Sequence, residues 1–223
     1  LGYPGTMGVK FIDYIIGDKT VIPRENLNFF SEKIIYMPDT YYPTFNERKV
    51  SKKNYLKSDF GLDEESFVFG SFNNSYKISS IEFKIWMELL EKIENSSLVL
   101  LIHDELTKNN LVKEIEKNKQ DPNKVKFLKY VNPEEHLARH QLIDLYLDTF
   151  NYNGHTSSID ALYAGVPVLT KIGNSFTSRV CASILKSINM VSLITNNEKE
   201  YFDLALEIAK NKKTLNKLKQ DLK

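Results

Sequence analysis

From about residue 66 to its end, the chain alternates between short apolar runs and amphipathic segments. The first two runs, SFVFGSF at 66–72 and SLVLLI at 97–102, consist largely of β-branched, aliphatic and aromatic residues. Shorter runs of the same kind follow at 125–128, 144–148, 166–170 and 190–194. Continuous apolar runs of this length are typical of strands that are buried on both faces. The pattern therefore predicts a sheet whose two faces are both covered.

Helical periodicity fills the segments between these runs. One apolar stripe is expected in 81–93, formed by Ile81, Ile85, Trp86, Leu89, Leu90 and Ile93. Further helices are predicted at 108–119, 133–141, 156–164 and 178–187, and 198–223 is predicted to form two polar helices. Gly165 follows one helix and Pro167 opens a strand, which suits both residue types. Such alternation predicts an α/β fold with a Rossmann-like, doubly wound parallel sheet.

The first 60 residues have a different character. A strand is predicted at 11–16, followed by a passage rich in loops and tyrosines, and 48–53 is polar and basic like a linker or an exposed connection. The chain starts with LGYPG and no methionine, which reads as the middle of a longer sequence. We therefore expect a fragment of a larger protein.

Composition narrows the classes of partner. Thirty basic and 29 acidic residues leave a net charge of +1, which does not favour nucleic acid or an anionic membrane as a partner. No apolar run approaches the ~18 residues of a membrane span. Cys181 is the single cysteine, so no internal disulfide is possible, and a reducing compartment such as the cytoplasm is expected.

Three loops carry the candidate chemistry. In an open parallel sheet, ligands bind beyond the carboxyl ends of the strands, where loops lead into helices. The loops there are FNNSYK at 72–77, VNPEEH at 131–136 with Arg139 one turn later, and NYNGHTSS at 151–158 with Asp160 in the first turn of the following helix.

The third loop is the most informative. Gly154 permits close approach of the backbone, the N–H groups of 155–158 would face an anion, and Thr156 and Ser157 add hydroxyl groups. Asp160 can reach ribose hydroxyls. The alternative interpretation is plain helix capping by Thr and Ser, with Asp160 complementing the helix dipole.

The other candidate side chains also have two interpretations each. Lys77 either binds phosphate or is a solvated lysine. His136 and Arg139 lie three residues apart, so they either address one ligand together or form a surface pair. His155 is a base, a metal ligand or a phosphate donor. The spacing of the four histidines does not favour a metal site, and no GxxxxGK[ST], GxGxxG or nucleophile elbow is present. Asp144 and Asp148 flank an apolar strand and are interpreted mainly as structural.

Six motifs in order make the chain similar to a known family. These are LGYPGTMG with FIDYIIGD, SEKIIYMPDTYY, SFNNSYKI, EEHLARHQLIDLYLDT, NGHTSSIDALYAGVPVLT and SRVCASIL. They resemble the catalytic region of the protein O-GlcNAc transferases, which are GT-B enzymes that transfer GlcNAc from UDP-GlcNAc to serine and threonine. The resemblance covers essentially the whole chain. It implies that 1–45 is the end of the N-terminal catalytic lobe with the crossing segment, and that 46–223 is the C-terminal lobe that binds the nucleotide sugar.

The resemblance also implies roles for individual residues. Lys77 and His155 would be catalytic, Lys77 by stabilising the diphosphate as UDP leaves, with Asn74 near the same phosphates. His136 would flank the uracil in the loop that begins at Val131, with Arg139 supporting it. His155, Thr156 and Ser157 would bind phosphate, and Asp160 would accept from the ribose. Leu1, Gly2 and Tyr152 would lie at the sugar pocket. No permanently bound cofactor and no metal are required.

Departures from the family keep alternatives open. Pro133 stands where animal members have a lysine, and Tyr152 replaces a smaller residue, so the donor sugar is uncertain. The related SPINDLY-type fucosyltransferases use GDP-fucose, but they lack the His-Thr-Ser…Asp pattern, so UDP-GlcNAc is favoured over GDP-fucose or UDP-glucose. A non-catalytic nucleotide-binding module is the other alternative.

The remaining expectations concern the parent protein. Most of the N-terminal lobe and the tetratricopeptide repeats are expected to lie outside these residues, so the chain alone should bind nucleotide weakly and transfer sugar poorly. The protein itself is expected to be cytoplasmic, or also nuclear if it comes from a eukaryote, and its partner is a protein acceptor.

Overall fold

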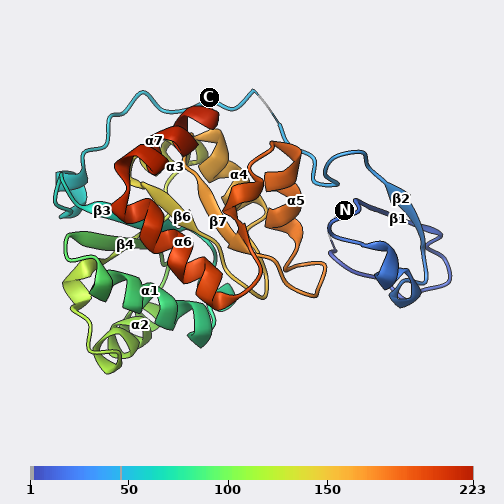
Figure 1. Cartoon of the computed structure of the whole chain (residues 1–223), viewed down its shortest axis with the longest axis horizontal. Coiled ribbons are helices and arrows are strands. Elements are labelled where there is room, and N and C mark those ends of the chain that lie inside the picture. Colours follow the sequence, from blue (N-terminus) through green and yellow to red (C-terminus); the bar gives the residue numbers. More distant parts are fainter. Residues whose placement is uncertain (1–2, 46, 223) are drawn as a thin grey trace.

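The computed structural model describes residues 3–45 and 47–222, which form two separate parallel sheets (Figure 1). The large sheet has the order β5-β4-β3-β6-β7-β8, and all neighbouring strands are parallel. Its strands are β3 Phe67–Ser71, β4 Ser96–Leu101, β5 Val125–Leu128, β6 Leu145–Leu147, β7 Val168–Lys171 and β8 Ile194–Thr195. The predicted doubly wound α/β sheet is confirmed. Its order reverses between β3 and β6, because the chain adds strands outward first on one side and then on the other.

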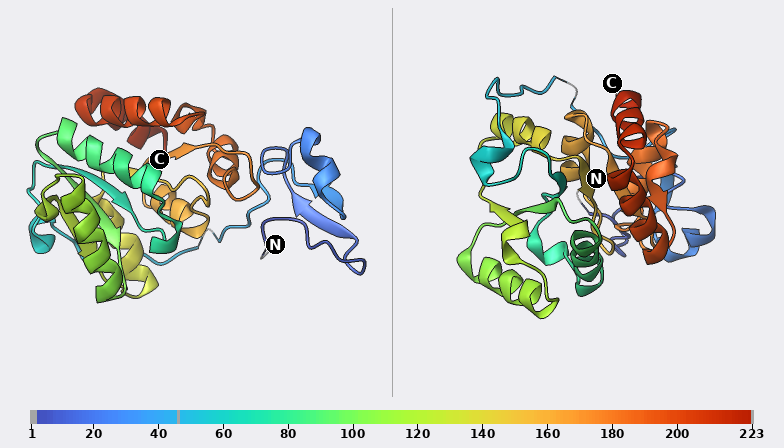
Figure 2. Two further views of the ribbon diagram at one scale, coloured as in Figure 1. Left: turned by 90° about the horizontal axis from the view of Figure 1, so that it is seen from below. Right: turned by 60° about the vertical axis from the view of Figure 1, so that its left-hand side comes forward.

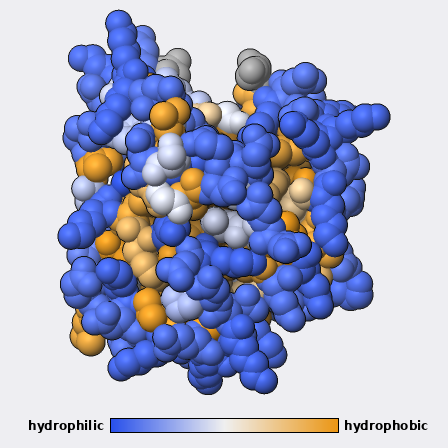
Figure 3. All heavy atoms as spheres, turned by 90° about the vertical axis from the view of Figure 1, so that its left-hand side faces the viewer, coloured by the Kyte–Doolittle hydropathy of each residue, from blue (hydrophilic) through white to orange (hydrophobic). Residues whose placement is uncertain are grey.

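Helices cover both faces of this sheet (Figure 2). They are α1 Ser80–Lys92, α2 Glu105–Lys117, α3 Pro133–Ala138, α4 Thr156–Tyr163, α5 Val180–Ser187, α6 Glu198–Lys210 and α7 Lys212–Asp221. All six residues of β4 are buried, and Trp86, Tyr146 and Tyr201 are almost fully enclosed in the same core. Burial of each large apolar side chain stabilises the fold by about 1.5–3 kcal/mol. The view in Figure 3 is largely hydrophilic, as expected when the apolar strands lie inside.

The first helix differs in detail from its predicted stripe. Ile81 is 54% exposed, whereas Phe83, Trp86 and Leu90 face the core. Residues spaced by four advance about 40° per step around a helix, so a stripe from 81 to 93 drifts off the buried face. A capping box between Ser79 and Glu82 fixes the start of α1.

Two predicted strands are also displaced. The strand expected at 11–16 begins at Tyr14, and Phe11 is exposed. The run at 190–194 forms a 3₁₀ turn, Val191–Leu193, before the two-residue strand β8. Asn189 has a positive φ of 60°, so the chain leaves α5 through a turn. Leu193 is buried by the 3₁₀ turn that follows, and the strand β8 starts only after it.

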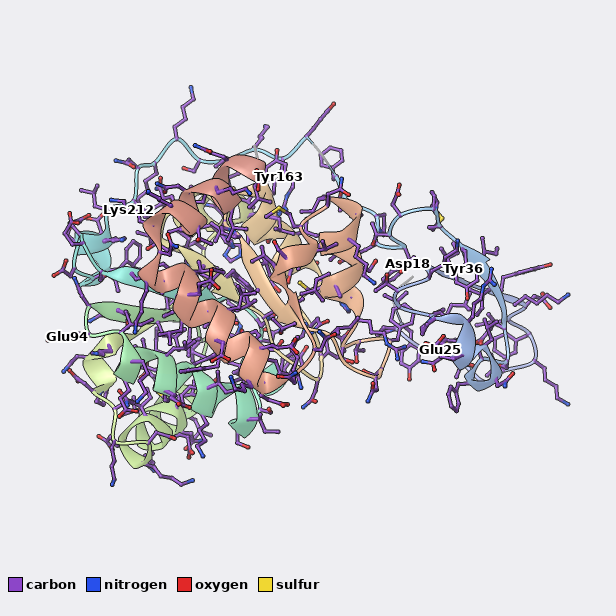
Figure 4. The ribbon with its side chains drawn as sticks, in the orientation of Figure 1. Asp18, Glu25, Tyr36, Glu94, Tyr163 and Lys212 are labelled. Carbon is purple, nitrogen blue, oxygen red and sulfur yellow. The ribbon has the colours of Figure 1, made fainter. Side chains whose placement is uncertain are left out.

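The small sheet pairs β1, Tyr14–Gly17, with β2, Lys33–Tyr36. It lies to one side of the large unit, and the segment that follows β2 crosses over to β3 (Figure 1). Asp18 connects the two units through hydrogen bonds (Figure 4). Its Oδ2 accepts one hydrogen bond from the Ser183 Oγ of α5 at 2.6 Å and another from the Tyr41 N–H at 2.9 Å. The division at residue 45 stays a prediction.

None of the helices described between residues 3 and 222 combines the length and the apolar character that a membrane span requires.

Candidate functional site

A cleft of about 510 Å³ opens at the carboxyl ends of β3 and β6, where the strand order reverses. This is the position at which open parallel sheets bind ligands. The predicted residues that line the cleft are Asn74, Lys77, Val131, His136, His155, Thr156, Ser157 and Asp160. Arg139 and Tyr152 contact lining residues without being part of the lining. Leu1 and Gly2 lie outside the described residues.

Lys77 links the loop after β3 to the loop after β6. A short 3₁₀ turn, Ser75–Lys77, places its side chain over the neighbouring loop. The Lys77 Nζ donates to the Asn153 carbonyl at 3.2 Å and lies 4.2 Å from the centre of the Tyr152 ring. Burial lowers the pKa of Lys77, and the nearby Asp148 opposes this effect. The ammonium group therefore lies where it can meet an anion at the edge of this loop.

Asp148 organises the loop that follows β6. It is fully buried, and its carboxylate accepts from the Gly154 N–H at 2.6 Å, the Thr149 N–H at 2.9 Å and the Thr170 Oγ1 at 2.7 Å. Burial raises the pKa of Asp148 to about 6, and these hydrogen bonds partly counteract the rise. Its predicted structural character fits these contacts, but nothing in the sequence indicated that it holds Gly154 in place.

Asp144 lies at the opposite end of the same strand. Its carboxylate accepts from the Val68 N–H and from the Lys219 Nζ, each at 3.0 Å, which is a structural role far from the cleft.

The start of α4 is not capped by any side chain. His155 is the N-cap residue and makes no side-chain cap hydrogen bond. The hydroxyl groups of Thr156 and Ser157 are used elsewhere: Thr156 Oγ1 bonds the Tyr42 hydroxyl at 2.9 Å, and Ser157 Oγ donates to Asn73 Oδ1 at 2.6 Å. The capping interpretation is therefore wrong for these hydroxyls, and the first N–H groups of α4 are available to an anion in the cleft.

Gly154 is required here by close packing. A Cβ on Gly154 would lie 2.7 Å from Ser157 Oγ and 3.1 Å from the Ser158 backbone nitrogen. Both contacts are tighter than ordinary van der Waals distance, so a larger residue would push the loop away from α4.

His155 lies between two tyrosine rings. Its ring stacks on Tyr42 with 5.6 Å between centroids and lies 5.1 Å from that of Tyr152. Its Nε2 is buried and has no hydrogen-bond partner among the described residues. Burial, assisted by Lys77, lowers the pKa of His155 to about 4. The imidazole is therefore neutral at physiological pH, with one donor nitrogen and one acceptor nitrogen.

His136 has a tautomer that its neighbour fixes. Its Nδ1 lies 2.7 Å from the Nη2 of Arg139, and a guanidinium group can only donate. Burial, Arg139 and Arg48 lower the pKa of His136 to about 4, so the ring is neutral and its proton is assigned to Nε2. That nitrogen lies 3.7 Å from Asp160 Oδ2. His136 therefore offers an N–H donor on the side of Asp160.

Arg139 contacts His136 but does not line the cleft. It is 2% exposed, donates to the Lys129 carbonyl at 2.7 Å and lies 5.0 Å from the centre of the Phe72 ring. Arg139 and His136 are in contact, but a buried Arg139 does not form the surface pair that was one interpretation. It does not line the cleft either, so it can influence the cleft only through the orientation of His136.

Asp160 lies in the second turn of α4 and not in its first turn as predicted, because the helix starts at Thr156. Its Oδ1 accepts from the Arg48 Nη1 at 2.5 Å. Arg48 belongs to the polar stretch that we predicted to be a linker or an exposed connection, and it also lines the cleft. Sequence reasoning missed Arg48, since no local pattern relates residues 112 positions apart.

Tyr42 and Tyr130 also line the cleft, although neither was predicted as a site residue. Tyr130 donates to Asn74 Oδ1 at 3.3 Å, and Tyr42 bonds Thr156. Asn74 also donates through Nδ2 to the Tyr76 hydroxyl at 3.4 Å. In the described part of the chain, no group of three or more His, Cys, Asp or Glu residues is arranged to hold a metal ion.

Known proteins share this architecture. An O-GlcNAc transferase mutant of Thermobaculum terrenum superposes with a TM-score of 0.88 at 26% identity, covering 100% of this chain and 42% of the other. The structure of TarM matches with a TM-score of 0.62 over 93% of this chain and 39% of its own, but at 14% identity it supports the fold alone.

Curated relatives match over the full chain. SEC of Arabidopsis thaliana, described as a probable UDP-N-acetylglucosamine–peptide N-acetylglucosaminyltransferase, is 31% identical over 231 residues, which are 100% of this chain and 23% of SEC. SPINDLY of Petunia hybrida, which has the same description, is 29% identical over 100% of this chain and 24% of its own length. The chain thus spans about a quarter of the length of these relatives.

The sequence profile of Glycosyl transferase family 41 matches residues 1–48 and 44–223. The predicted resemblance is confirmed, and the chain belongs to glycosyl transferase family 41.

Proposed function

We propose that this chain provides the donor-binding half of a glycosyltransferase that transfers GlcNAc from UDP-GlcNAc to serine or threonine of a protein. The observation that carries the proposal is the convergence of Lys77, His155, His136 and Asp160 with the start of α4 in one cleft at the strand-order reversal. Relatives described as UDP-N-acetylglucosamine–peptide transferases support the choice of donor and acceptor.

The diphosphate would lie between Lys77 and the first turn of α4. These groups flank the same loop, since Lys77 bonds the carbonyl of Asn153 and α4 begins three residues later. A helix N-terminus and an ammonium group both favour an anion. Neutral His155 can add one hydrogen bond to a phosphate oxygen.

The uridine would occupy the part of the cleft bounded by His136 and Asp160. His136 presents its Nε2–H, and Asp160 keeps Oδ2 as an acceptor for a ribose hydroxyl. Val131 and Tyr130 line the same cleft and would limit the space for the base.

In the reaction, the acceptor hydroxyl oxygen would form a bond to the anomeric carbon as the bond from that carbon to the UDP oxygen breaks, and the hydroxyl proton would pass to the leaving diphosphate or to solvent. Negative charge then grows on the leaving diphosphate, where Lys77 and the N–H groups of α4 stabilise it. These groups can supply that stabilisation, so we propose that the reaction needs no metal.

A calorimetric titration of the 223-residue chain with UDP, UDP-GlcNAc and GDP tests the donor. We expect UDP and UDP-GlcNAc to bind at least tenfold more tightly than GDP, with roughly tenfold loss for Asp160→Ala, as for a charged hydrogen bond. Added EDTA should leave the affinity unchanged. A preference for GDP would favour a fucosyl donor, and the absence of nucleotide binding would favour a non-catalytic module.

A further inference from the structure

Arg48 comes from the segment that crosses between the two sheets, yet its side chain reaches the nucleotide cleft. Its Nη1 lies 2.5 Å from Asp160 Oδ1, and its guanidinium group lies 5.5 Å from the centre of the Tyr163 ring. Asp160 and Tyr163 are three residues apart on α4, so they belong to the same side of that helix. Arg48 therefore packs against one side of α4, although it belongs to the connection between β2 and β3.

The backbone of Arg48 is held as well. The Arg48 N–H donates to the Tyr163 hydroxyl at 3.3 Å, and this hydroxyl donates to the Arg48 carbonyl at 3.2 Å. Figure 4 shows Tyr163 close to the crossing segment. Because the backbone of Arg48 is held in place, its side chain starts from a fixed position. This favours a persistent ion pair with Asp160 over a transient surface contact.

The contact determines what Asp160 can do. The side chain of Asp160 is 8% exposed, and an unpaired carboxylate at that depth would be costly. Arg48 pairs with Oδ1, which leaves Oδ2 near His136 Nε2. An ionised carboxylate has about four acceptor positions, so Oδ2 can still accept from a ligand hydroxyl.

We propose that Arg48 is a positioning residue for sugar recognition: it keeps Asp160 ionised and oriented so that Oδ2 reads a ribose hydroxyl of the nucleotide. This inference rests on the proposed function, since it assumes a nucleotide in the cleft. It also makes the connection between β2 and β3 part of the site, because Arg48 lies on this connection and not on a strand or helix of the large sheet.

The test compares UDP, 2′-deoxy-UDP and 3′-deoxy-UDP on the 223-residue chain. The diphosphate and the uracil are common to all three ligands. The attraction of the diphosphate to the positive charge of Arg48 is therefore the same for each ligand, and it cancels in the ratio of the UDP affinity to the affinity of a deoxy analogue. We expect the unaltered chain to prefer UDP over one deoxy analogue by roughly tenfold or more, as for a hydrogen bond to a charged group. Arg48→Gln should reduce this preference to below about threefold, and Arg48→Lys should restore part of it.

Two further variants make the result specific. Lys49→Gln removes the same charge from the exposed neighbouring residue and should leave the preference intact. Asp160→Asn should abolish the preference, and adding Arg48→Gln to it should cause no further loss, because both residues act through the same carboxylate. Matching circular dichroism spectra would show that each variant is folded.

Three outcomes would overturn the inference. If Arg48→Gln weakens UDP and both deoxy analogues equally, Arg48 serves only as a cation for the phosphates. If Arg48→Gln tightens UDP binding, Arg48 competes with the ribose for Asp160. If the unaltered chain binds UDP but does not distinguish the deoxy analogues, Asp160 does not read the ribose, although the proposed function stands. Failure of the unaltered chain to bind UDP would overturn the proposed function and this inference with it.

Discussion

Lys77 and His155 are two partly buried nitrogen bases at the same loop, and burial affects them in a related way. It lowers the pKa of both, and the positive charge of Lys77 adds to the effect on His155. The site thus combines a cation with a neutral imidazole, a pairing that can bind phosphate without a second positive charge. Burial extends the pH range over which the His155 imidazole is neutral, because it lowers the pKa of His155 to about 4.

Removal of Lys77 should show which part of the nucleotide it binds. We expect Lys77→Ala to weaken UDP by roughly tenfold or more and uridine by less than about twofold, because only UDP carries the charge that Lys77 faces. Calorimetric titration of both ligands measures the difference. Lys84→Ala, which changes an exposed lysine of α1, is the control and should affect neither ligand. Equal losses for UDP and uridine would show that Lys77 supports the fold of the cleft instead of the phosphate.

At the scale of elements, the loop between β6 and α4 carries the proposed phosphate site, because it joins the end of a strand to the start of a helix. The Asp148 carboxylate accepts a hydrogen bond from the Gly154 N–H, and Ser157 and Ser158 of α4 leave no room for a Cβ at Gly154. The loop therefore has little freedom to move away from the start of α4.

Gly154→Ala should disrupt this element. The added Cβ would meet Ser157 Oγ and the Ser158 backbone, so we expect an overpacking loss of about 1–3 kcal/mol in the free energy of unfolding. We also expect weaker UDP binding, since the start of α4 must shift. Urea denaturation and UDP titration measure the two effects. Gly5→Ala is the matched control, because its Cβ meets only the Tyr3 side chain at 3.5 Å. An unchanged affinity for UDP in Gly154→Ala would argue against the phosphate site at α4.

At the scale of the whole molecule, buried histidines link stability to pH. The pKa values of His136 and His155 are lowered to about 4, and that of His140 to about 3, mainly by burial. Between pH 6.5 and 4 the unfolded chain binds protons that the folded chain excludes, so the free energy of unfolding falls as the pH falls. Asp148, whose pKa is raised to about 6, acts in the opposite direction over the same range, as does Asp160.

We therefore expect urea denaturation to give a lower free energy of unfolding at pH 5 than at pH 7. His155→Asn should make this fall shallower by about 1.4 kcal/mol per pH unit at most, the contribution of one excluded proton. His103→Asn, at an exposed position, should leave the slope unchanged. A slope that is the same in His155→Asn and in the unaltered chain would contradict the burial of a neutral His155.

Much of the fold was predictable because a buried strand or helix face requires apolar residues at regular positions in the sequence. Runs such as 97–102 indicated strands covered on both faces, and β4 is buried along its whole length. The loops after β3, after β5 and after β6 all contribute residues to one cleft, because parallel strands end at the same edge of a sheet. That this cleft binds the nucleotide sugar stays a prediction. The predictions failed where local geometry decides: Ile81 drifts off the helix face, and the chain turns at Asn189 before β8.

The sequence by itself determined the parallel α/β architecture, the three loops that line the cleft and the family, since apolar periodicity and short motifs are local properties of the chain. Only the tertiary structure decided that the strand order reverses between β3 and β6 and that Arg139 fixes the His136 tautomer from behind. The tertiary structure also places Arg48 beside Asp160, although Arg48 was predicted to lie in a linker or an exposed connection. Such contacts depend on the path of the chain through space, because burial and pairing of distant residues leave no periodic signal at either position.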